Sequence, residues 1–155
     1  MATEASDEGL DGRVAVVTGG GAAGDGIGNG RAACMLLARS GARVLVVDRK
    51  PELAQRTVEM IAAEGGEAAA FEADVTDSDD CAGMVTEATR LWSRLDVLIN
   101  NVGVGSHGSV VDEPIESFEK VMRINVRSMV LASKHAIPAM IGGGAGGAIV
   151  NISSI

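Results

Sequence analysis

A glycine-rich segment between an apolar run and a helical pattern is the feature that most constrains this chain. Seven of the twelve residues from Gly19 to Gly30 are glycine, directly behind the apolar residues 14–17 and ahead of the helix-forming residues 31–39. Glycines lack a Cβ atom, so the backbone can approach a phosphate, and the free N–H groups at a helix start point toward its charge. The segment therefore predicts a nucleotide-binding α/β protein, with a merely flexible loop as the alternative.

Length and composition predict one domain with an aliphatic core. The chain has 155 residues, which is long enough for a proper core. Its residues are 46% hydrophobic but only 2% aromatic, so the core is expected to consist of Val, Ile, Leu, Ala and Met. A net charge of −8 argues against nucleic acid or an anionic membrane as partner, because both need basic faces. Cys34 and Cys81 lack metal-ligand spacing and are expected to be buried or half-buried reduced thiols, consistent with a cytoplasmic protein. No segment resembles a targeting signal or a membrane span.

Apolar runs that alternate with helical patterns predict five buried strands and four helices. The strands are expected at residues 13–18, 43–47, 68–73, 96–99 and 148–152. The first helix is expected at 26–40 and is ended by Gly41, and the second is expected at 51–64. The third is expected to begin after a cap at Asp77 or Ser78 and has apolar positions as far as Leu95. The fourth is expected at 115–140. Residues 142–147 are expected to form a flexible connector.

This alternation predicts a Rossmann-type doubly wound parallel sheet with helices on both faces. If strands two and three step one way from strand one, and four and five step the other, the strand order is 3-2-1-4-5. Ligands bind at the carboxyl ends of strands where such a sheet reverses its winding. The glycine loop and the segment from Asn100 to Gly103 flank that point, and both are unusual in composition. The crevice between them is therefore the predicted site.

Asp48 lies at the end of the second strand, twenty residues beyond Gly28. A carboxylate there can accept hydrogen bonds from both hydroxyls of an adenosine ribose and would repel a 2′-phosphate, which favours NAD over NADP. Arg49 and Lys50 follow directly, and either could partly neutralise a phosphate. The alternative is a solvated turn.

A series of motifs, in order and at suitable spacings, resembles the N-terminal part of the short-chain dehydrogenases/reductases. They are Thr18-Gly19, Gly26-Ile-Gly28, Asp48, Asp74-Val75, Asn100-Asn-Val-Gly103, Ile124-Asn-Val126 and Ile149-Val-Asn-Ile-Ser-Ser154. The resemblance implies a flexible segment at residues 1–10 and a Rossmann domain at 11–155 that is incomplete on its C-terminal side. It also implies an NAD-dependent oxidoreductase acting on a small alcohol or ketone. One departure is an enlarged glycine loop, with six residues between Gly19 and Gly26.

The resemblance also implies roles in coenzyme binding. Asp74 would accept a hydrogen bond from the adenine amino group, beside the backbone of Val75. Asn100 and Gly103 would line the crevice near the ribose, and Asn100 could also, or only, tie the fourth strand to a neighbour. The pyrophosphate would be held by Gly19, Gly26, Ile27 and Gly28.

Two catalytic roles follow from the same resemblance. Ser154, or Ser153 if the register slips by one, would hydrogen-bond the substrate oxygen and stabilise its developing charge. Asn125 would support a proton-relay water, although a polar residue inside a helix is unremarkable by itself. The family's acid/base tyrosine and its lysine follow the serine, and this chain contains no tyrosine. His107 is expected in a loop and His135 on a helix surface, and neither is assigned in their place.

The 155 residues alone are therefore expected to bind NAD weakly, to turn nothing over and to expose an apolar fifth strand at the sheet edge. Two other classes of function stay open. One is a non-catalytic nucleotide-binding module used for sensing or assembly. The other is a structural partner that packs through the helix at 115–140, the helix through which a full-length enzyme is expected to form a homo-oligomer.

Overall fold

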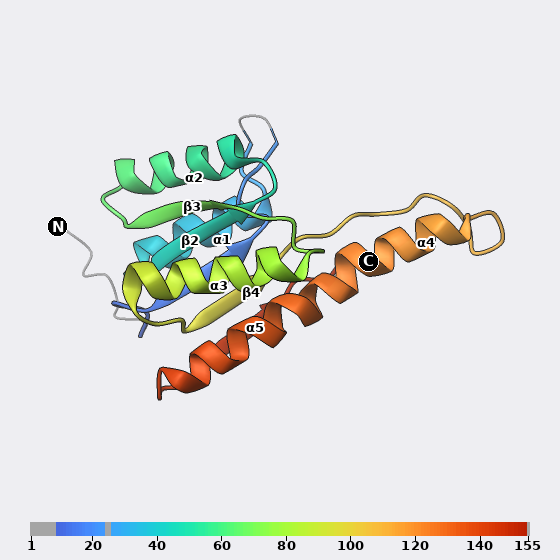
Figure 1. Ribbon diagram of the computed structural model, residues 1–155. Helices are drawn as coiled ribbons and strands as arrows, with labels where there is room; N and C mark the ends of the chain where they lie inside the picture. Colours follow the sequence, from blue (N-terminus) through green and yellow to red (C-terminus); the bar gives the residue numbers. More distant parts are fainter. Residues whose placement is uncertain (1–8, 24–25, 155) are drawn as a thin grey trace.

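The chain folds into a parallel five-stranded sheet with helices on both faces (Figure 1). The computed structural model describes residues 9–23 and 26–154. The strands are β1 (Val14–Thr18), β2 (Arg43–Asp48), β3 (Ala68–Glu72), β4 (Val97–Asn100) and β5 (Ala148–Asn151). The helices are α1 (Asn29–Arg39), α2 (Pro51–Ala63), α3 (Ser78–Trp92), α4 (Ile115–Met122) and α5 (Ser128–Gly142), with a π-helical turn, η1 (Arg123–Arg127), between the last two.

The strand order is β3-β2-β1-β4-β5, with every neighbouring pair parallel. Val16 in the middle of β1 pairs with Leu45 on one side and Leu98 on the other. The chain therefore adds β2 and then β3 on one side of β1. It then crosses back and adds β4 and β5 on the other side. This confirms the predicted order and places the reversal of winding between β1 and β4.

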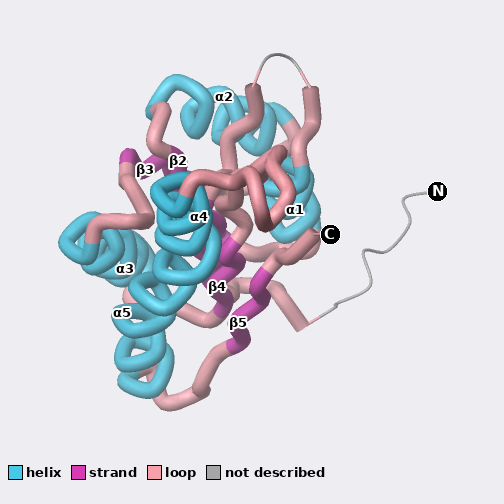
Figure 2. Tube along the Cα trace, turned by 90° about the vertical axis from the view of Figure 1, so that its right-hand side faces the viewer, coloured by secondary structure: helices cyan, strands magenta, loops and turns pink. Residues whose placement is uncertain are grey.

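Alternating side chains of the central strands enter two separate hydrophobic layers. Val14 and Val16 join the cluster that contains residues of α3 and α5, whereas Val17 joins the cluster of α1 and α2. All three valines are fully buried. The two helix layers lie on opposite sides of the sheet, as Figure 2 shows. Burial on both faces explains why the strands are apolar at every position rather than at every second one.

Three helix boundaries differ from the sequence-based expectation. The first helix begins at Asn29, not at residue 26, because Gly28 has an extended backbone (φ −79°, ψ 168°) and serves as the N-cap. The third helix ends at Trp92, because Ser93 adopts a left-handed conformation with φ 60°. The residues expected to form one helix over 115–140 form α4, η1 and α5, and α5 continues to Gly142. Asp77 caps α3 as expected, accepting hydrogen bonds from the N–H groups of Asp79 and Asp80.

The part of the chain after β4 is the most exposed. Figure 1 shows the loop after β4 and helix α4 extending away from the sheet. In β5 and just beyond it, Val150 and Ile152 are 45% and 39% exposed, because no strand pairs with the outer side of β5 among the described residues. No helix in residues 9–23 and 26–154 is both long enough and apolar enough to cross a membrane. Residues 1–8 of the expected N-terminal segment lie outside the described residues.

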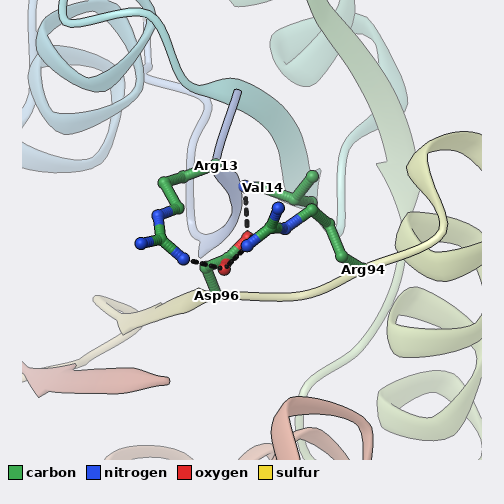
Figure 3. A network of polar contacts seen from close by, with 4 residues as sticks. All are labelled: Arg13, Val14, Arg94 and Asp96. Carbon is green, nitrogen blue, oxygen red and sulfur yellow. Dashed lines mark hydrogen bonds and ion pairs between the residues drawn. The ribbon is translucent and has the colours of Figure 1, made fainter. Parts of the chain in front are cut away.

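A buried carboxylate joins β1 to the segment before β4 at the amino edge of the sheet (Figure 3). Asp96 accepts a hydrogen bond from the Val14 N–H at 2.9 Å and from the Arg13 guanidinium at 3.0 Å. Two further hydrogen bonds, of 2.7 and 2.6 Å, come from Arg94. Burial alone would raise the pKa of Asp96, but the bonds from Arg94, Val14 and Arg13 outweigh it and lower the pKa below its usual value.

The Asp96 network predicts a pH-dependent contribution to stability. Because the folded pKa lies below the unfolded value of about 3.9, the stabilisation is complete above that value and is lost as the pH falls through it toward the folded pKa. We expect Asp96→Asn to lower the free energy of unfolding by about 1.5–3 kcal/mol at neutral pH and by less in acid, measured by urea unfolding. Asp112→Asn, at an exposed loop carboxylate, is the control. An equal loss for Asp96→Asn at both pH values would contradict the assignment.

Candidate functional site

A pocket of about 450 Å³ opens at the carboxyl edge of the sheet, at the predicted reversal of winding. Segments that follow four neighbouring strands supply its wall, and α4 and η1 supply the remainder. The lining residues are Gly19, Val47, Asp48, Arg49, Ala73, Asp74, Val75, Thr76, Asn101, Val102, Gly103, Val104, Lys120, Arg123 and Ile124. The volume lies within the range of small-molecule and cofactor sites.

The loops after β1 and β4 are fastened to each other beneath this pocket. The Asn101 side-chain amide donates hydrogen bonds to the carbonyl groups of Thr18 and Gly19, at 3.3 and 3.1 Å. The Asn101 backbone N–H donates to the Thr18 hydroxyl at 3.1 Å. Gly19 has φ 64°, a left-handed conformation that favours glycine. The two segments that flank the crevice therefore form one connected floor.

Helix α1 approaches that floor more closely than any side chain would allow. A Cβ atom on Gly30 would overlap the Gly19 carbonyl oxygen and would lie 2.6 Å from the Asn101 side-chain nitrogen. Gly30 is buried, and together with Gly28 and Ala33 it fits the Ala-ended form of the dinucleotide-binding pattern G-x-G-x-x-G. The close approach of helix and strand leaves a floor of bare backbone, which is what a bound pyrophosphate requires.

Asp48 brings a half-buried carboxylate to the pocket from the end of β2. Its Oδ2 accepts a hydrogen bond from the Gly21 N–H and its Oδ1 accepts one from the Lys50 N–H, both at 3.0 Å. A carboxylate has about four acceptor sites, so Asp48 keeps capacity for further donors. Arg49 lines the same pocket, so a carboxylate and a guanidinium lie together at this corner.

Asp74 is a second carboxylate in the wall, after β3. Its Oδ1 accepts hydrogen bonds from the Thr76 N–H at 2.9 Å and from the Thr76 hydroxyl at 2.7 Å. These two bonds, the backbone one first, lower the pKa of Asp74 against the opposing effect of burial, and the charges of Arg49 and Arg123 lower it further. Asp74 is therefore an ionised acceptor at neutral pH, held in one orientation by Thr76.

Asn100 and Asn125 engage partners within the protein. The Asn100 side chain is 3% exposed and donates to the Asn151 side chain at 2.9 Å, which ties β4 to β5. Asn125 lies in η1 and pairs with the backbone of Val104, accepting from its N–H and donating to its carbonyl, both at 2.8 Å. The contact that Asn100 makes is therefore the structural one considered above, a tie between the fourth strand and its neighbour. Asn125 fixes the loop that ends the pocket wall, from the kind of π-helical turn that is frequent at functional sites.

The pocket brings together five of the eleven residues expected at the site. These are Gly19, Asp48, Asp74, Val75 and Gly103. The other six are Gly26, Ile27 and Gly28 in the loop before α1, Asn100 and Asn125 at the contacts just described, and Ser154 after β5. Ser154 is exposed. Gly24 and Asp25, which complete the enlarged glycine loop, lie outside the described residues.

The two cysteines and the two histidines of the chain lie outside the pocket lining. Cys34 and Cys81 are buried free thiols, as predicted, and burial raises the pKa of Cys34 to about 12 and that of Cys81 to about 11. His107 is an exposed loop residue, as expected. His135 lies in helix α5, as expected, but it is half-buried and its Nε2 lies 3.0 Å from the Ser78 hydroxyl. None of the four residues lines the pocket.

Four polar residues of the pocket were not predicted: Thr76, Asn101, Lys120 and Arg123. Asn101 carries a signal in the sequence, because neighbouring residues of a strand point to opposite faces and only one residue of the Asn100-Asn101 pair can face the loop after β1. Lys120 and Arg123 are three residues apart, which places them on one helix face. Nothing in the local sequence indicates that α4 and η1 lie over the ends of β1 and β3.

Comparison with known proteins assigns a family to this architecture. The family model of the short chain dehydrogenases matches residues 13–155. An uncharacterised oxidoreductase of Thermotoga maritima is 39% identical over 145 residues, which cover 94% of this chain and 55% of that protein. Short-chain dehydrogenase reductase 5 of Arabidopsis thaliana is 34% identical over 151 residues, 97% of this chain and 56% of that protein. The chain thus spans about half the length of these relatives.

Solved structures give the same result for the fold. The crystal structure of a protein from Burkholderia xenovorans, assigned to the short-chain dehydrogenases/reductases, matches with a TM-score of 0.89 and 39% identity. The match covers 94% of this chain and 57% of that one. The described chain therefore corresponds to a little more than half of a fold already seen in crystals.

The close approach of α1 to the pocket floor predicts an intolerant position. We expect Gly30→Ala to lower the free energy of unfolding by about 1–3 kcal/mol, because the added methyl group must displace Gly19 or Asn101. Gly26→Ala is the matched control, since a Cβ there would meet nothing within 4 Å. Chemical unfolding of both variants gives the comparison. Equal stability of the Gly30→Ala variant and the wild type would show that the floor is not packed as described.

Proposed function

The chain belongs to the short-chain dehydrogenase family, and on that premise we propose that it binds a pyridine dinucleotide across the pocket at the carboxyl edge of the sheet. The observation that carries this proposal is the floor at Gly19, stripped of side chains by the approach of Gly30 and bordered by the carboxylates of Asp48 and Asp74. Bare backbone suits a pyrophosphate, and fixed carboxylates suit the donor groups of an adenosine. The residues present therefore fit the coenzyme.

Asp74 and Asp48 would recognise the adenosine half. Asp74 is ionised and held by Thr76, so it would accept a hydrogen bond from the adenine amino group beside the backbone of Val75. Asp48 would accept the ribose hydroxyls with the acceptor capacity that Gly21 and Lys50 leave. Gly103, in the opposite wall, leaves room for the second ribose.

The pyrophosphate would lie against Gly19 and the loop that leads into α1. Gly26, Ile27 and Gly28 are exposed and precede the first residue of the helix, Asn29. Their backbone N–H groups would meet the phosphates at the positive end of the helix dipole. Lys120 and Arg123, which line the same pocket from α4 and η1, add positive charge to it.

The structure supports NAD more than NADP as the coenzyme. A 2′-phosphate would meet the Asp48 carboxylate, which is held in place by two backbone N–H groups and would repel it. Arg49 beside it weakens that discrimination without removing it, because the guanidinium attracts phosphate. A preference for NAD, rather than exclusion of NADP, is the expected result.

The whole protein would be an oxidoreductase acting on a small alcohol or ketone. When bound, the nicotinamide supplies or accepts a hydride. Ser154 would stabilise the negative charge that develops on the substrate oxygen, and Asn125 would keep the loop at Val104 in position and support a proton-relay water. The exposed apolar residues Phe118, Val126 and Val130 of α4, η1 and α5 support assembly of the whole protein into a homo-oligomer.

Coenzyme choice is the direct test of the role given to Asp48. In calorimetric titrations of the intact protein, we expect the wild type to bind NAD more tightly than NADP. Asp48→Ser should shift the ratio of the two affinities toward NADP by about tenfold, or about 1.4 kcal/mol, because the repulsion is removed. Arg49→Ser, the matched variant at the neighbouring residue, should shift the ratio of the two affinities toward NAD. A wild type that prefers NADP, or a ratio that Asp48→Ser leaves unchanged, would contradict the role of Asp48.

A further inference from the structure

Arg31 is a fully buried arginine in the first turn of α1, outside the residues that line the pocket. Its Nε donates a hydrogen bond to the Thr57 hydroxyl of α2 at 3.0 Å. Its two terminal nitrogens donate to the carbonyl oxygens of Gly26 at 2.7 Å and Ala22 at 3.4 Å. None of the ion pairs among the described residues involves Arg31. The guanidinium is therefore a buried positive charge held by neutral oxygens.

These bonds hold the enlarged glycine loop at one point within it and at the residue that follows it. Ala22 lies in its first half, and Gly26 is the residue directly after it. Thr57, itself fully buried, donates from the same hydroxyl to the Gly20 carbonyl at 2.9 Å. Arg31 and Thr57 thus connect the loop to α1 and α2, which pack against each other on one face of the sheet (Figure 2).

The direction of the Gly26 and Ala22 carbonyl groups decides where the next amides point. The peptide bonds are trans, and in a planar trans peptide the C=O and the N–H point in opposite directions. Because the Gly26 oxygen faces the Arg31 guanidinium, the Ile27 N–H faces away from it, and the Ala23 N–H does so likewise. No described residue accepts a hydrogen bond from either amide. Both donors are thus left for a ligand.

Packing alone does not explain an arginine at this position. Arg31 shares its helix face with Cys34, Met35 and Ala38, all of which are buried. An apolar side chain would continue that face, and replacing a buried charge by a well-packed apolar residue is often neutral for stability or favourable. The donors of Arg31 serve the loop and Thr57 rather than the apolar face of the helix.

We propose that Arg31 is the positioning residue of the enlarged glycine loop: it draws the Ala22 and Gly26 carbonyl groups inward, turns the following amides toward a pyrophosphate, and finds its counter-charge in that pyrophosphate. This inference rests on the proposed dinucleotide site. It adds a buried residue that touches no ligand but sets the affinity for the diphosphate part of the coenzyme. It also accounts for how the amides of Ala23 and Ile27 keep their direction.

The test compares a ligand that contains the pyrophosphate with one that lacks it. ADP and adenosine are titrated into the intact protein, and their dissociation constants are measured by NMR. In Arg31→Met we expect the constant for ADP to rise about tenfold, or about 1.4 kcal/mol, while that for adenosine changes less than about twofold. Arg31→Lys, which keeps the charge with fewer well-placed donors, should recover part of the loss. Arg39→Met, on the exposed part of the same helix, should leave both constants unchanged.

The outcomes separate this inference from the function on which it rests. A wild type that binds neither ADP nor NAD would overturn both. A wild type that binds ADP, together with an Arg31→Met variant that keeps the wild-type ratio of the two constants, would overturn the role of Arg31 alone, because a purely structural residue affects both ligands alike. If Arg31→Met does not fold, Thr57→Val decides, since it removes the hydroxyl that joins Arg31 to Gly20 and should also weaken ADP relative to adenosine.

Discussion

The pairing of β1 with β2 on one side and β4 on the other is the constraint on which the rest of this structure depends. Because both pairings are parallel, the loops that leave β1 and β4 emerge side by side. Their helices cover opposite faces, because the chain steps in opposite directions after the two strands and the crossovers are right-handed. Asn101 fastens these loops together through Thr18 and Gly19. At the other end of the same two segments, Asp96 holds the start of β1. The pocket therefore sits on two segments that are joined to each other at both ends.

The architecture was predictable because its signals are local and repeated. Each of the five strands was found within about two residues, since continuous apolar runs arise when a sheet is covered on both faces. The strand order followed from right-handed crossovers together with the assumption that strands two and three step one way from strand one and strands four and five the other. Errors arose where backbone conformation rather than hydrophobic pattern sets a boundary, as at the extended Gly28 and the left-handed Ser93. The interruption of the long helix by η1 is a hydrogen-bonding change that apolar spacing does not reveal.

The site was less predictable, because it depends on which way side chains point and on contacts between distant segments. Asp48 and Asp74 were found from their positions at strand ends, and both line the pocket. Asn100 and Asn101 could not be told apart by residue type, and in the structure Asn101 lines the pocket whereas Asn100 does not. Arg31 was counted only as part of a helix, because its partners, Ala22, Gly26 and Thr57, are brought to it by the loop and by α2.

The central claim is that a pyridine dinucleotide lies over the floor at Gly19, where the sheet reverses its winding. Amide spectra of the 15.7 kDa chain, recorded by NMR with and without NAD, test it most directly. We expect shifts at Gly19, Ile27 and Val75, and no shifts at the opposite edge of the sheet, represented by Arg13 and Leu95. Shifts confined to that opposite edge, or an unchanged spectrum at saturating NAD and NADP, would contradict the account.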